Sequence, residues 1–463
     1  MTGQRGQLVV VSNRVSGPAG RGAAGAQGGL AGALEAVLKR RGGTWCGWSG
    51  NERDEFTGDV HVTCRDGVRK ATIDLEPQDV EEYYNGYANS TLWPLFHCRL
   101  DLTRYERDFG KGYERVNKRI ADCAAPLIGS GDLVWVHDYH LMALGEGLRV
   151  RGIANRIGFF LHIPWPPARL FASLPFHERL ASALLKYDLI GFQCDEWLEN
   201  FLHYCRKELG AAVDEQSGRI KHEGVTSHAR AYPVGIDFDY FTALAVTSEA
   251  QEAGWRLWSS TRERTVMIGV DRLDYSKGLP ERLDGIGCFF ERYPERTRDL
   301  VFVQIAPPSR EDVKSYRDIR ALLEQKTGQI NGAFSEVDLV PIRYVNQGYS
   351  QAQLYGFYRA ARIALVTPLH DGMNLVAKEY VAAQDPLDPG VLILSRFAGA
   401  ARQLDAALIV NPHNPNEIAE AIRTAMDMPL EERRSRWERL AANVRDENVH
   451  VWAGNFLREL ESV

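Results

Sequence analysis

The sequence predicts an α/β protein built from two Rossmann-like domains with parallel sheets. Its 463 residues exceed what one hydrophobic core usually organises, so two domains of roughly 200 residues each are expected. Short apolar runs rich in β-branched residues alternate with helical patterns, as in βα units whose sheet is buried on both faces. The predicted strands are residues 8–12, 133–136, 157–161, 189–192, 266–270, 300–305, 363–366, 391–394 and 408–410.

The predicted strands stop after residue 241, and a polar stretch follows at 241–264. We therefore place a domain boundary there, which gives predicted domains at 1–241 and 242–440. The C-terminal end is charged and helical in pattern, with Trp452 and Phe456 among its apolar positions. We expect a C-terminal helix at 441–463 that packs back on the first domain.

Composition excludes several classes of partner. The chain is 44% hydrophobic and 25% charged, which is ordinary for a globular enzyme. A net charge of −6 gives no electrostatic reason to expect nucleic acid or an anionic membrane, and no apolar run approaches transmembrane length. The seven cysteines are scattered and contain no C-x-x-C, which argues against a disulfide framework or a structural zinc site and favours a cytoplasmic compartment.

A glycine-rich segment follows the first predicted strand. Gly20, Gly22 and Gly25 form a G-x-G-x-x-G, which raises a nicotinamide dinucleotide interpretation. The spacing argues against it, because the first glycine lies beyond the tight turn and no acidic residue ends a second strand about 20 residues later. We favour a loop that closes over a ligand, with the Arg14 guanidinium ready to bind a phosphate. The alternative is a disordered surface loop.

Aromatic residues crowd the first domain. Aromatic faces stack on the apolar faces of sugar rings, yet most aromatic side chains at such density belong to the core. We expect two of five to contact a ligand, the five being Trp45, Trp48, Tyr83, Tyr84 and Trp93.

Polar side chains follow two neighbouring predicted strands. His137, Asp138 and His140 come after the strand at 133–136, and His162 follows the next. These groups could orient sugar hydroxyls, act as acid and base, or bind a metal. A metal site is disfavoured, because the spacing is irregular and no cysteine supports it. The D-x-D at 237–239 is interpreted as a turn and helix cap rather than a metal ligand pair.

Cations follow the strands of the second domain. Arg272 and Lys277 come after the strand at 266–270, where they could neutralise a leaving diphosphate. Alone, such a pair is as often a solvated loop with surface salt bridges. Arg310 is a further cation after a strand, and its alternative role is to pair with Glu311 or Asp312.

The segment DGMNLVAKEYVAAQ (371–384) begins just after the strand at 363–366, so a buried strand ends where a helix begins. The first N–H groups of a helix lack internal acceptors and carry partial positive charge, so Met373, Asn374 and Leu375 could cradle a diphosphate. Glu379 lies one turn further on, where it could accept hydrogen bonds from a ribose diol. The alternative is a buried helix with an incidental Glu379, and with Lys378 on its solvent side.

Taken together, these motifs resemble the trehalose-6-phosphate synthase family of retaining sugar-nucleotide transferases, glycosyltransferase family 20. The resemblance covers nearly the whole chain. It rests on a series of sequence blocks in the same order, and together these blocks indicate the family far more specifically than any single block does. The blocks are VSNR (11–14), GGL (28–30), WCGWSG (45–50), EYYN (82–85), LWP (92–94), HDYHL (137–141), FFLHIP (159–164), DRLDYSKGLPER (271–282), QIAPPSR (304–310) and DGMNLVAKEYVAAQ (371–384).

The resemblance implies a GT-B fold, in which two Rossmann-like domains face a central cleft, the acceptor domain coming first and the nucleotide-sugar domain second. The acceptor, glucose 6-phosphate, would be held by Arg14, Trp48, Tyr84, Trp93, Asp138 and Arg310. The donor would be held by Gly29, His162, Arg272, Lys277, Asp371, Met373, Asn374, Leu375 and Glu379. The residues implied at the reacting centre are Asp138, His162, Arg272, Lys277 and Asp371.

The implied reaction moves glucose from a nucleotide-glucose, UDP-glucose first and GDP- or ADP-glucose as alternatives, to give α,α-trehalose 6-phosphate. It needs no metal and no other cofactor, and nucleic acid and membrane are not expected as partners. A homo-oligomer is possible, and a separate phosphatase is expected to act on the product. Two alternatives stay open: a related transferase with another phosphorylated acceptor, such as glycerol 3-phosphate or a cyclitol phosphate, and a non-catalytic sugar-phosphate sensor.

Overall fold

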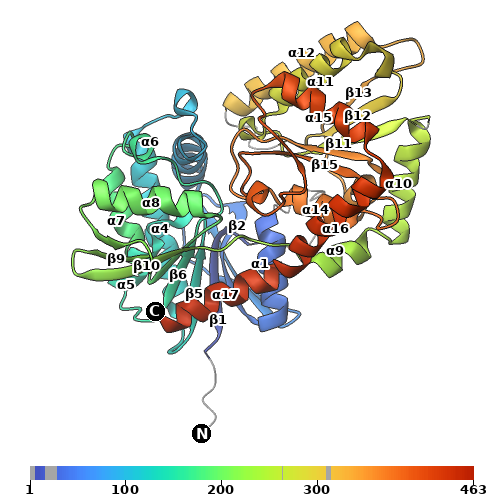
Figure 1. The fold of residues 1–463 in the computed structure, drawn as a ribbon. Coiled ribbons are helices and arrows are strands. Elements are labelled where there is room, and N and C mark those ends of the chain that lie inside the picture. The colour runs from blue at the N-terminus through green and yellow to red at the C-terminus, as the bar shows by residue number, and fades with distance from the viewer. Residues whose placement is uncertain (1–5, 16–28, 263, 309–313) are drawn as a thin grey trace. The chain divides into compact units, whose positions relative to one another are not determined.

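The computed structural model describes residues 6–15, 29–262, 264–308 and 314–463. The described chain forms two compact units. Unit 1 comprises the described residues up to Pro233 together with Val449–Val463, and unit 2 is Val234–Asn448. The predicted α/β class with two Rossmann-like domains is confirmed, since each unit contains a sheet of mainly parallel strands flanked by helices (Figure 1). The domain limits drawn from the sequence, 1–241, 242–440 and 441–463, remain a proposal about where each functional domain ends.

The sheet of unit 1 has, among the described residues, ten strands in the order β3-β4-β2-β1-β5-β6-β7-β10-β9-β8. Its centre is parallel, and antiparallel pairs occur only towards its edges, at β3 with β4 and at β8, β9 and β10. The strands are β1 (Leu8–Arg14), β2 (Gly43–Glu52), β3 (His61–Arg65), β4 (Val68–Leu75), β5 (Leu133–His137), β6 (Ile157–Phe160), β7 (Leu189–Phe192), β8 (Ala212–Asp214), β9 (Arg219–His222) and β10 (Val225–Ala231).

One helix of unit 1 is a π-helix, which is wider than an α-helix. It spans Val80–Leu92, continues directly from the short α2 and leads into α3. The α-helices are α1 (Gly29–Arg41), α2 (Pro77–Asp79), α3 (Trp93–Phe96), α4 (Arg107–Ala124), α5 (Leu144–Val150), α6 (Ala168–Phe171), α7 (His177–Leu184), α8 (Asp195–Lys207) and α17 (Val449–Ser462).

The sheet of unit 2 is parallel throughout its described strands, in the order β13-β12-β11-β14-β15-β16. The strands are β11 (Thr265–Val270), β12 (Leu300–Ile305), β13 (Ile342–Val345), β14 (Ile363–Val366), β15 (Val391–Ser395) and β16 (Leu408–Val410). The helices are α9 (Phe238–Leu244), α10 (Ser248–Ser260), α11 (Leu279–Arg292), α12 (Lys314–Phe334), α13 (Gln351–Ala360), α14 (Leu375–Ala383), α15 (Pro415–Asp427) and α16 (Leu430–Asp446).

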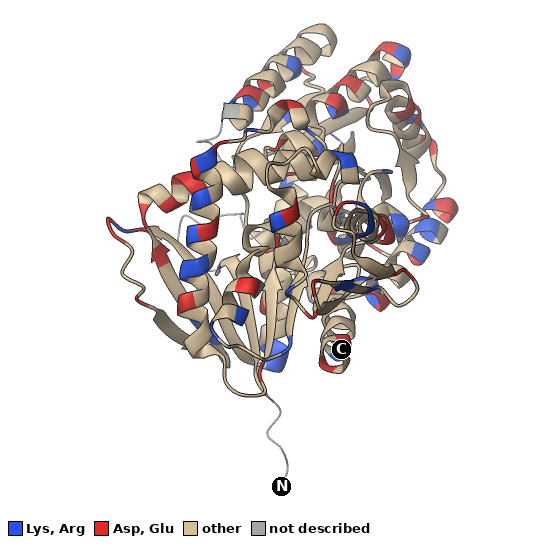
Figure 2. Cartoon of the chain, turned by 90° about the vertical axis from the view of Figure 1, so that its left-hand side faces the viewer, with Lys and Arg blue, Asp and Glu red and all other residues tan. Residues whose placement is uncertain are grey.

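Every predicted strand is present, whereas several strands were not predicted. β2 was missed because three glycines and a polar end interrupt its β-rich pattern, and β3 is exposed along its whole length. The polar stretch at 241–264 is mostly helix α10, which Thr247 caps by accepting a hydrogen bond from the N–H of Ala250. Acidic and basic residues are interspersed along the helices (Figure 2), and the net charge of the sequence is −6.

The C-terminal helix α17 belongs to unit 1, where it lies beside the strands of the first sheet (Figure 1). The Phe456 ring is fully buried and stacks on Trp135 of β5, with ring centroids 4.8 Å apart. Gly158 and Gly191, on β6 and β7, make room for this ring, because a Cβ on either would collide with it. The apolar face predicted for this segment is therefore part of the core of unit 1.

We predict that Phe456→Ala lowers the free energy of unfolding of unit 1 by about 3–5 kcal/mol, since it leaves a cavity beside Trp135. The measurement is urea denaturation followed by tryptophan fluorescence. Val451→Ala on the exposed side of the same helix is the matched control and should have little effect. Equal shifts for the two variants would contradict the packing of α17 described here.

Candidate active site

A cation and three aromatic rings line up at the carboxyl end of β1. The Arg14 guanidinium lies over the Trp48 ring, 5.0 Å from its centroid, and the edge of Trp48 meets Tyr84 at 5.5 Å. Tyr84 in turn stacks on His140, at 6.0 Å and an interplanar angle of 13°. Gly50, whose φ is 93°, leaves the space that the Arg14 guanidinium occupies. Arg14 is exposed and Tyr84 is partly exposed, so both can reach an anionic ligand.

Trp93 lies apart from this row, at the start of α3. Its ring is buried and packs 5.6 Å from Tyr139 and 4.2 Å from His97. Trp45 and Tyr83 are also buried, and each hydrogen-bonds inward: Trp45 Nε1 donates to Ser12 Oγ, and the Tyr83 hydroxyl donates to Asn13 Oδ1. Of the five aromatic residues singled out in the sequence, Tyr84 is the most open to a ligand.

Asp138 and His162 lie together where β5 and β6 end. Asp138 has a φ of 75°, a strained value for a residue with a side chain, and its N–H donates to the carbonyl of Phe160 at 2.8 Å. Its Oδ1 accepts the backbone N–H of His162 at 3.2 Å. This backbone conformation fixes the Asp138 carboxylate beside His162, which is the kind of strain found at functional sites.

The His162 imidazole is a neutral link in a chain of polar side chains. The Gln193 amide nitrogen can only donate, so His162 Nδ1 accepts from it at 3.3 Å and the proton of His162 lies on Nε2. That Nε2 donates to His137 Nδ1 at 3.1 Å. Burial lowers the pKa of His162 to about 3, and burial and the nearby His162 lower the pKa of His137 well below its usual value. Both rings are uncharged at neutral pH.

In unit 2, Lys277 and Asp371 form a compact pair at the carboxyl ends of β11 and β14. Lys277 Nζ donates to Asp371 Oδ2 at 2.5 Å, and Asn374 Nδ2 donates to the same oxygen at 3.0 Å. The Lys277 and Asp371 side chains are only 13% and 12% exposed. Asn374 has a φ of 68° and immediately precedes α14, so its own side chain ties Asp371 to the start of that helix.

Arg282 was not assigned a role from the sequence, yet it organises this end of the sheet. It is fully buried in the first turn of α11. Its guanidinium pairs with Asp271 at 2.7 Å and donates to Gln304 Oε1 and Thr367 Oγ1, both at 2.9 Å. Burial raises the pKa of Asp271, and the charge of Arg282 opposes that rise. Its place between the apolar positions Leu279 and Leu283 is consistent with burial, but the sequence alone does not identify its partners, which lie far away along the chain.

Helix α14 presents its first turn to this edge, as the sequence predicted. It begins at Leu375, and Met373 is buried just before it. The alternative that placed Lys378 on the solvent side is wrong, because Lys378 is fully buried and donates to the carbonyl of Val234 at 2.8 Å and to Gln403 Oε1 at 2.7 Å. Burial lowers the pKa of Lys378 to about 7.

Glu379 is partly buried one turn into α14, and burial raises the pKa of its carboxyl to about 7. Arg272 is partly buried directly after Asp271. Gly29 begins α1, while Arg310 and the glycine-rich segment at 16–28 lie outside the described residues.

The D-x-D at 237–239 acts as the predicted helix cap, since Asp237 accepts the N–H of Tyr240 at 3.1 Å at the start of α9.

The model of glycosyltransferase family 20 matches residues 4–462. The chain belongs to glycosyltransferase family 20. It is 44% identical over 457 residues to the trehalose-6-phosphate synthase of Sinorhizobium fredii, covering 98% of each chain, and 43% identical to that of an Enterobacter species.

Solved structures of similar proteins agree with this family membership. A crystal structure of an α,α-trehalose-phosphate synthase (UDP-forming) from Burkholderia xenovorans, in complex with glucose-6-phosphate, is 44% identical and has a TM-score of 0.95, over 98% of this chain and 100% of that one. An E. coli structure bound with UDP-2-fluoro glucose is 40% identical, with a TM-score of 0.93 over 98% of this chain and 99% of that one. The fold of this family 20 chain is therefore GT-B.

No helix in the described part of the chain combines the length and apolar character that spanning a membrane requires. Among those same residues, no three His, Cys, Asp or Glu side chains gather as metal ligands would.

The pKa of Glu379 leads to a prediction about stability. Because its pKa rises from 4.5 to about 7 on folding, the folded protein keeps a proton that the unfolded chain has lost between these values. Stability should therefore fall as the pH rises through this window, by about 1–3 kcal/mol. Glu379→Gln cannot titrate and should lose less stability between about pH 5 and pH 8.

Urea denaturation of the wild type and of Glu379→Gln at a series of pH values checks this sign. Glu438→Gln, on the exposed side of α16, is the control and should follow the wild-type profile. Parallel profiles for the wild type and Glu379→Gln would show that the carboxyl does not titrate as described.

Proposed function

We propose that this protein transfers glucose from a nucleotide-activated glucose to glucose 6-phosphate, forming α,α-trehalose 6-phosphate and a nucleoside diphosphate. One observation carries the proposal: the chain matches, over 98% of its length and at 44% identity, a trehalose-phosphate synthase crystallised with glucose-6-phosphate. Several of the residues that the family resemblance implies, namely Asp138, His162, Arg272 and Asp371, follow the carboxyl ends of parallel strands, where α/β folds bind ligands, and this supports the proposal.

Unit 1 is assigned to the acceptor. Arg14 would bind the phosphate of glucose 6-phosphate with its guanidinium, and the Tyr84 hydroxyl would donate to the same group. Trp48 holds the Arg14 guanidinium by a cation–π contact, and Asp138 would accept hydrogen bonds from the sugar hydroxyls. Trp93 would pack against the ring, and Arg310 would add a second cation. Tyr84 and Arg14 belong to one row of contacts, so a single phosphate can engage both.

Unit 2 is assigned to the donor. Arg272 and Lys277 would hold the diphosphate, with the N–H groups at Met373, Asn374 and Leu375 and the backbone of Gly29 adding donors. Glu379 would accept from the ribose diol, and His162 and Asp371 would bind the transferred glucose. The Lys277–Asp371 pair suits this role, because the Lys277 ammonium can turn from one anion to another when the diphosphate arrives. UDP-glucose is the proposed donor, in line with the E. coli relative bound with UDP-2-fluoro glucose.

The proposed reaction retains the configuration at the anomeric carbon. The bond from that carbon to the diphosphate oxygen breaks, and a bond to the hydroxyl of the acceptor forms on the same face. The departing phosphate oxygen takes the proton of that hydroxyl, so no enzymic nucleophile is needed. The transition state resembles an oxocarbenium ion beside a growing negative charge, which Arg272 and Lys277 stabilise.

The direct test uses purified protein, glucose 6-phosphate, and UDP-, GDP- or ADP-glucose in separate tubes. Nucleotide release is measured and the disaccharide is identified. Formation of α,α-trehalose 6-phosphate supports both acceptor and donor assignments. Nucleotide release only with another phosphorylated acceptor, such as glycerol 3-phosphate or a cyclitol phosphate, would identify a related transferase. No turnover with any acceptor, but binding of glucose 6-phosphate, would identify a sensor.

We predict that Arg272→Ala and Lys277→Ala each reduce kcat on the order of 100-fold, as loss of one oxyanion donor does. Steady-state kinetics with saturating substrates give this value. Arg298→Ala is a matched control in the same unit, because Arg298 lies on the surface and pairs with Glu336. An unchanged kcat in both variants would refute the proposed stabilisation of the leaving group.

A further inference from the structure

The π-helix Val80–Leu92 carries the acceptor side chain Tyr84 and ends at Trp93. Its wide geometry extends to its last turn, where the N–H of Trp93 donates to the carbonyl of Ala88 five residues earlier. π-Helices are rare and short, and they occur frequently at functional sites. One that runs over 13 residues needs support from outside, because its own backbone geometry is unfavourable.

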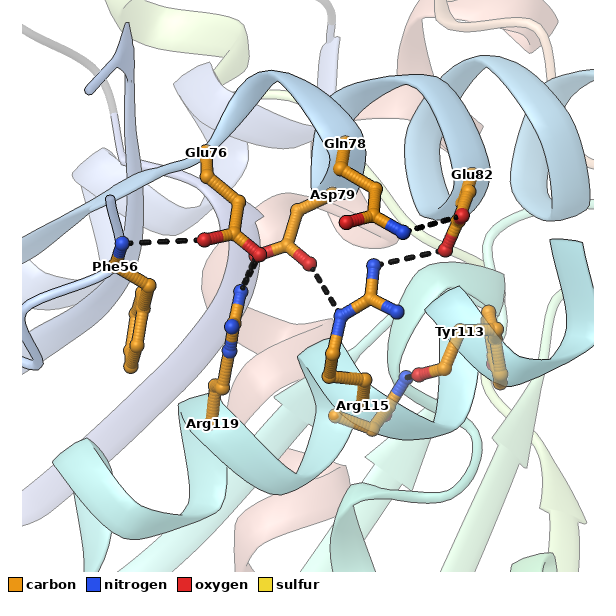
Figure 3. Close-up of polar contacts among 9 residues, drawn as sticks. Phe56, Glu76, Gln78, Asp79, Glu82, Tyr113, Arg115 and Arg119 are labelled. Atoms are coloured by element: carbon orange, nitrogen blue, oxygen red, sulfur yellow. Dashed lines mark hydrogen bonds and ion pairs between the residues drawn. The ribbon is translucent and has the colours of Figure 1, made fainter. Parts of the chain in front are cut away.

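Charged support lies at the start of the helix (Figure 3). Two arginines of α4 point at the carboxylates that precede and open the π-helix. Arg115 Nε donates to Asp79 Oδ1 at 2.8 Å, and its Nη2 donates to Glu82 Oε2 at 2.8 Å. Arg119 donates to Asp79 Oδ2 and, at 2.9 Å, to Glu76 Oε1. Each Asp79 oxygen therefore has its own arginine.

Burial makes these contacts specific. Asp79 is fully buried, and the Arg115 and Arg119 side chains are 29% and 22% exposed. Burial would lower the pKa of Arg115, but its hydrogen bonds to Glu82 and Asp79 outweigh this effect and raise it. A buried carboxylate with two guanidiniums keeps one arrangement, because leaving any member unpaired is costly.

The π-helix also packs closely against α4, which restricts its position. A Cβ on Gly86 would run into the Phe109 ring of α4, and a Cβ on Gly112 of α4 would collide with Glu82. Further along, Asn89 Oδ1 accepts from the Tyr139 hydroxyl at 2.9 Å. The π-helix is thus pinned at its start by charge and along its length by contact.

We propose that Asp79, held by Arg115 and Arg119, is a positioning residue for the acceptor phosphate: it fixes the π-helix so that Tyr84 lies between Trp48 and His140. The inference rests on the proposed function, because it concerns the acceptor half of that reaction. Asp79 does not touch the substrate. It acts through the helix that bears Tyr84.

The test is Asp79→Asn, which keeps the shape of the side chain but places an amide N–H, a donor, against a guanidinium donor. We expect kcat/KM for glucose 6-phosphate to fall about 10- to 100-fold through KM, as small misplacements of binding groups cause. The KM for the nucleotide-glucose should stay unchanged. Hydrogen exchange should accelerate in residues 80–92.

Asp188→Asn is the matched control. Asp188 is a partly buried carboxylate of the same unit that pairs with Arg149 at 2.7 Å and accepts the N–H of Ile157, far in sequence from the π-helix. It tests loss of stability alone, so acceptor KM should stay at the wild-type value. Glu82→Gln is the milder second variant, since it removes the charge of Glu82 and leaves an amide that cannot accept from both Arg115 and Gln78 through two oxygens, while Asp79 keeps both arginines; a smaller rise in acceptor KM is expected.

The proposal is overturned if both π-helix variants keep the wild-type acceptor KM, or if Asp188→Asn raises acceptor KM to the same extent at an equal loss of melting temperature. Failure of the proposed function is a separate outcome. It appears as no transfer to glucose 6-phosphate by the wild type, before any variant is compared.

Discussion

The contacts of the buried Arg282 guanidinium are the interactions on which the carboxyl end of the unit 2 sheet depends. The guanidinium ties together Asp271 after β11, Gln304 on β12 and Thr367 after β14, and so adds side-chain contacts to the backbone ladder that joins these three neighbouring strands. A fully buried cation requires these partners, so the loops cannot drift without leaving its charge unpaired. Because Arg272 and Lys277 stand on the loop that begins at Asp271, the same interaction holds them in place before any substrate arrives. Such preorganisation is what electrostatic catalysis needs.

Unit 1 achieves the same rigidity by other means. There, two of the side chains assigned to the acceptor belong to a strained residue, Asp138, and to the π-helix that bears Tyr84. Neither backbone form is favourable by itself, so the surrounding contacts must enforce both. If Asp79 positions the helix as proposed, a residue remote from the ligand contributes to the specificity for the acceptor. Such supporting residues do not contact the substrate, so they cannot be identified from substrate contacts alone.

The sequence predicted the fold well because parallel strands are short, apolar and regularly spaced, as at 300–305 and 363–366. It also placed Lys277, Asp371 and Asn374 at one edge, since the carboxyl ends of parallel strands meet there. It could not predict the π-helix, because Val80–Leu92 has no pattern that separates a π-helix from an α-helix. Nor could it find Arg282, whose partners are distant in sequence and become neighbours only when the sheet forms. Residue chemistry alone could not tell which groups bind the donor and which bind the acceptor. That assignment came from the sequence blocks shared with the family.

The charge states on the two sides suit the proposed transfer. An oxocarbenium-like transition state gains positive charge at the sugar, so a protonated imidazole beside it would oppose the reaction. Burial keeps His162 neutral, with a pKa of about 3, and its ring can orient hydroxyls without adding charge. The cations are instead assigned to the diphosphate, where negative charge grows. When the acceptor attacks on the same face as the leaving group, the leaving phosphate oxygen is also the base that takes the acceptor's proton. Too much positive charge beside that oxygen would weaken its basicity. In the proposed site the Lys277 ammonium turns from Asp371 towards the diphosphate, and competition from Asp371 would limit how much positive charge the departing phosphate receives.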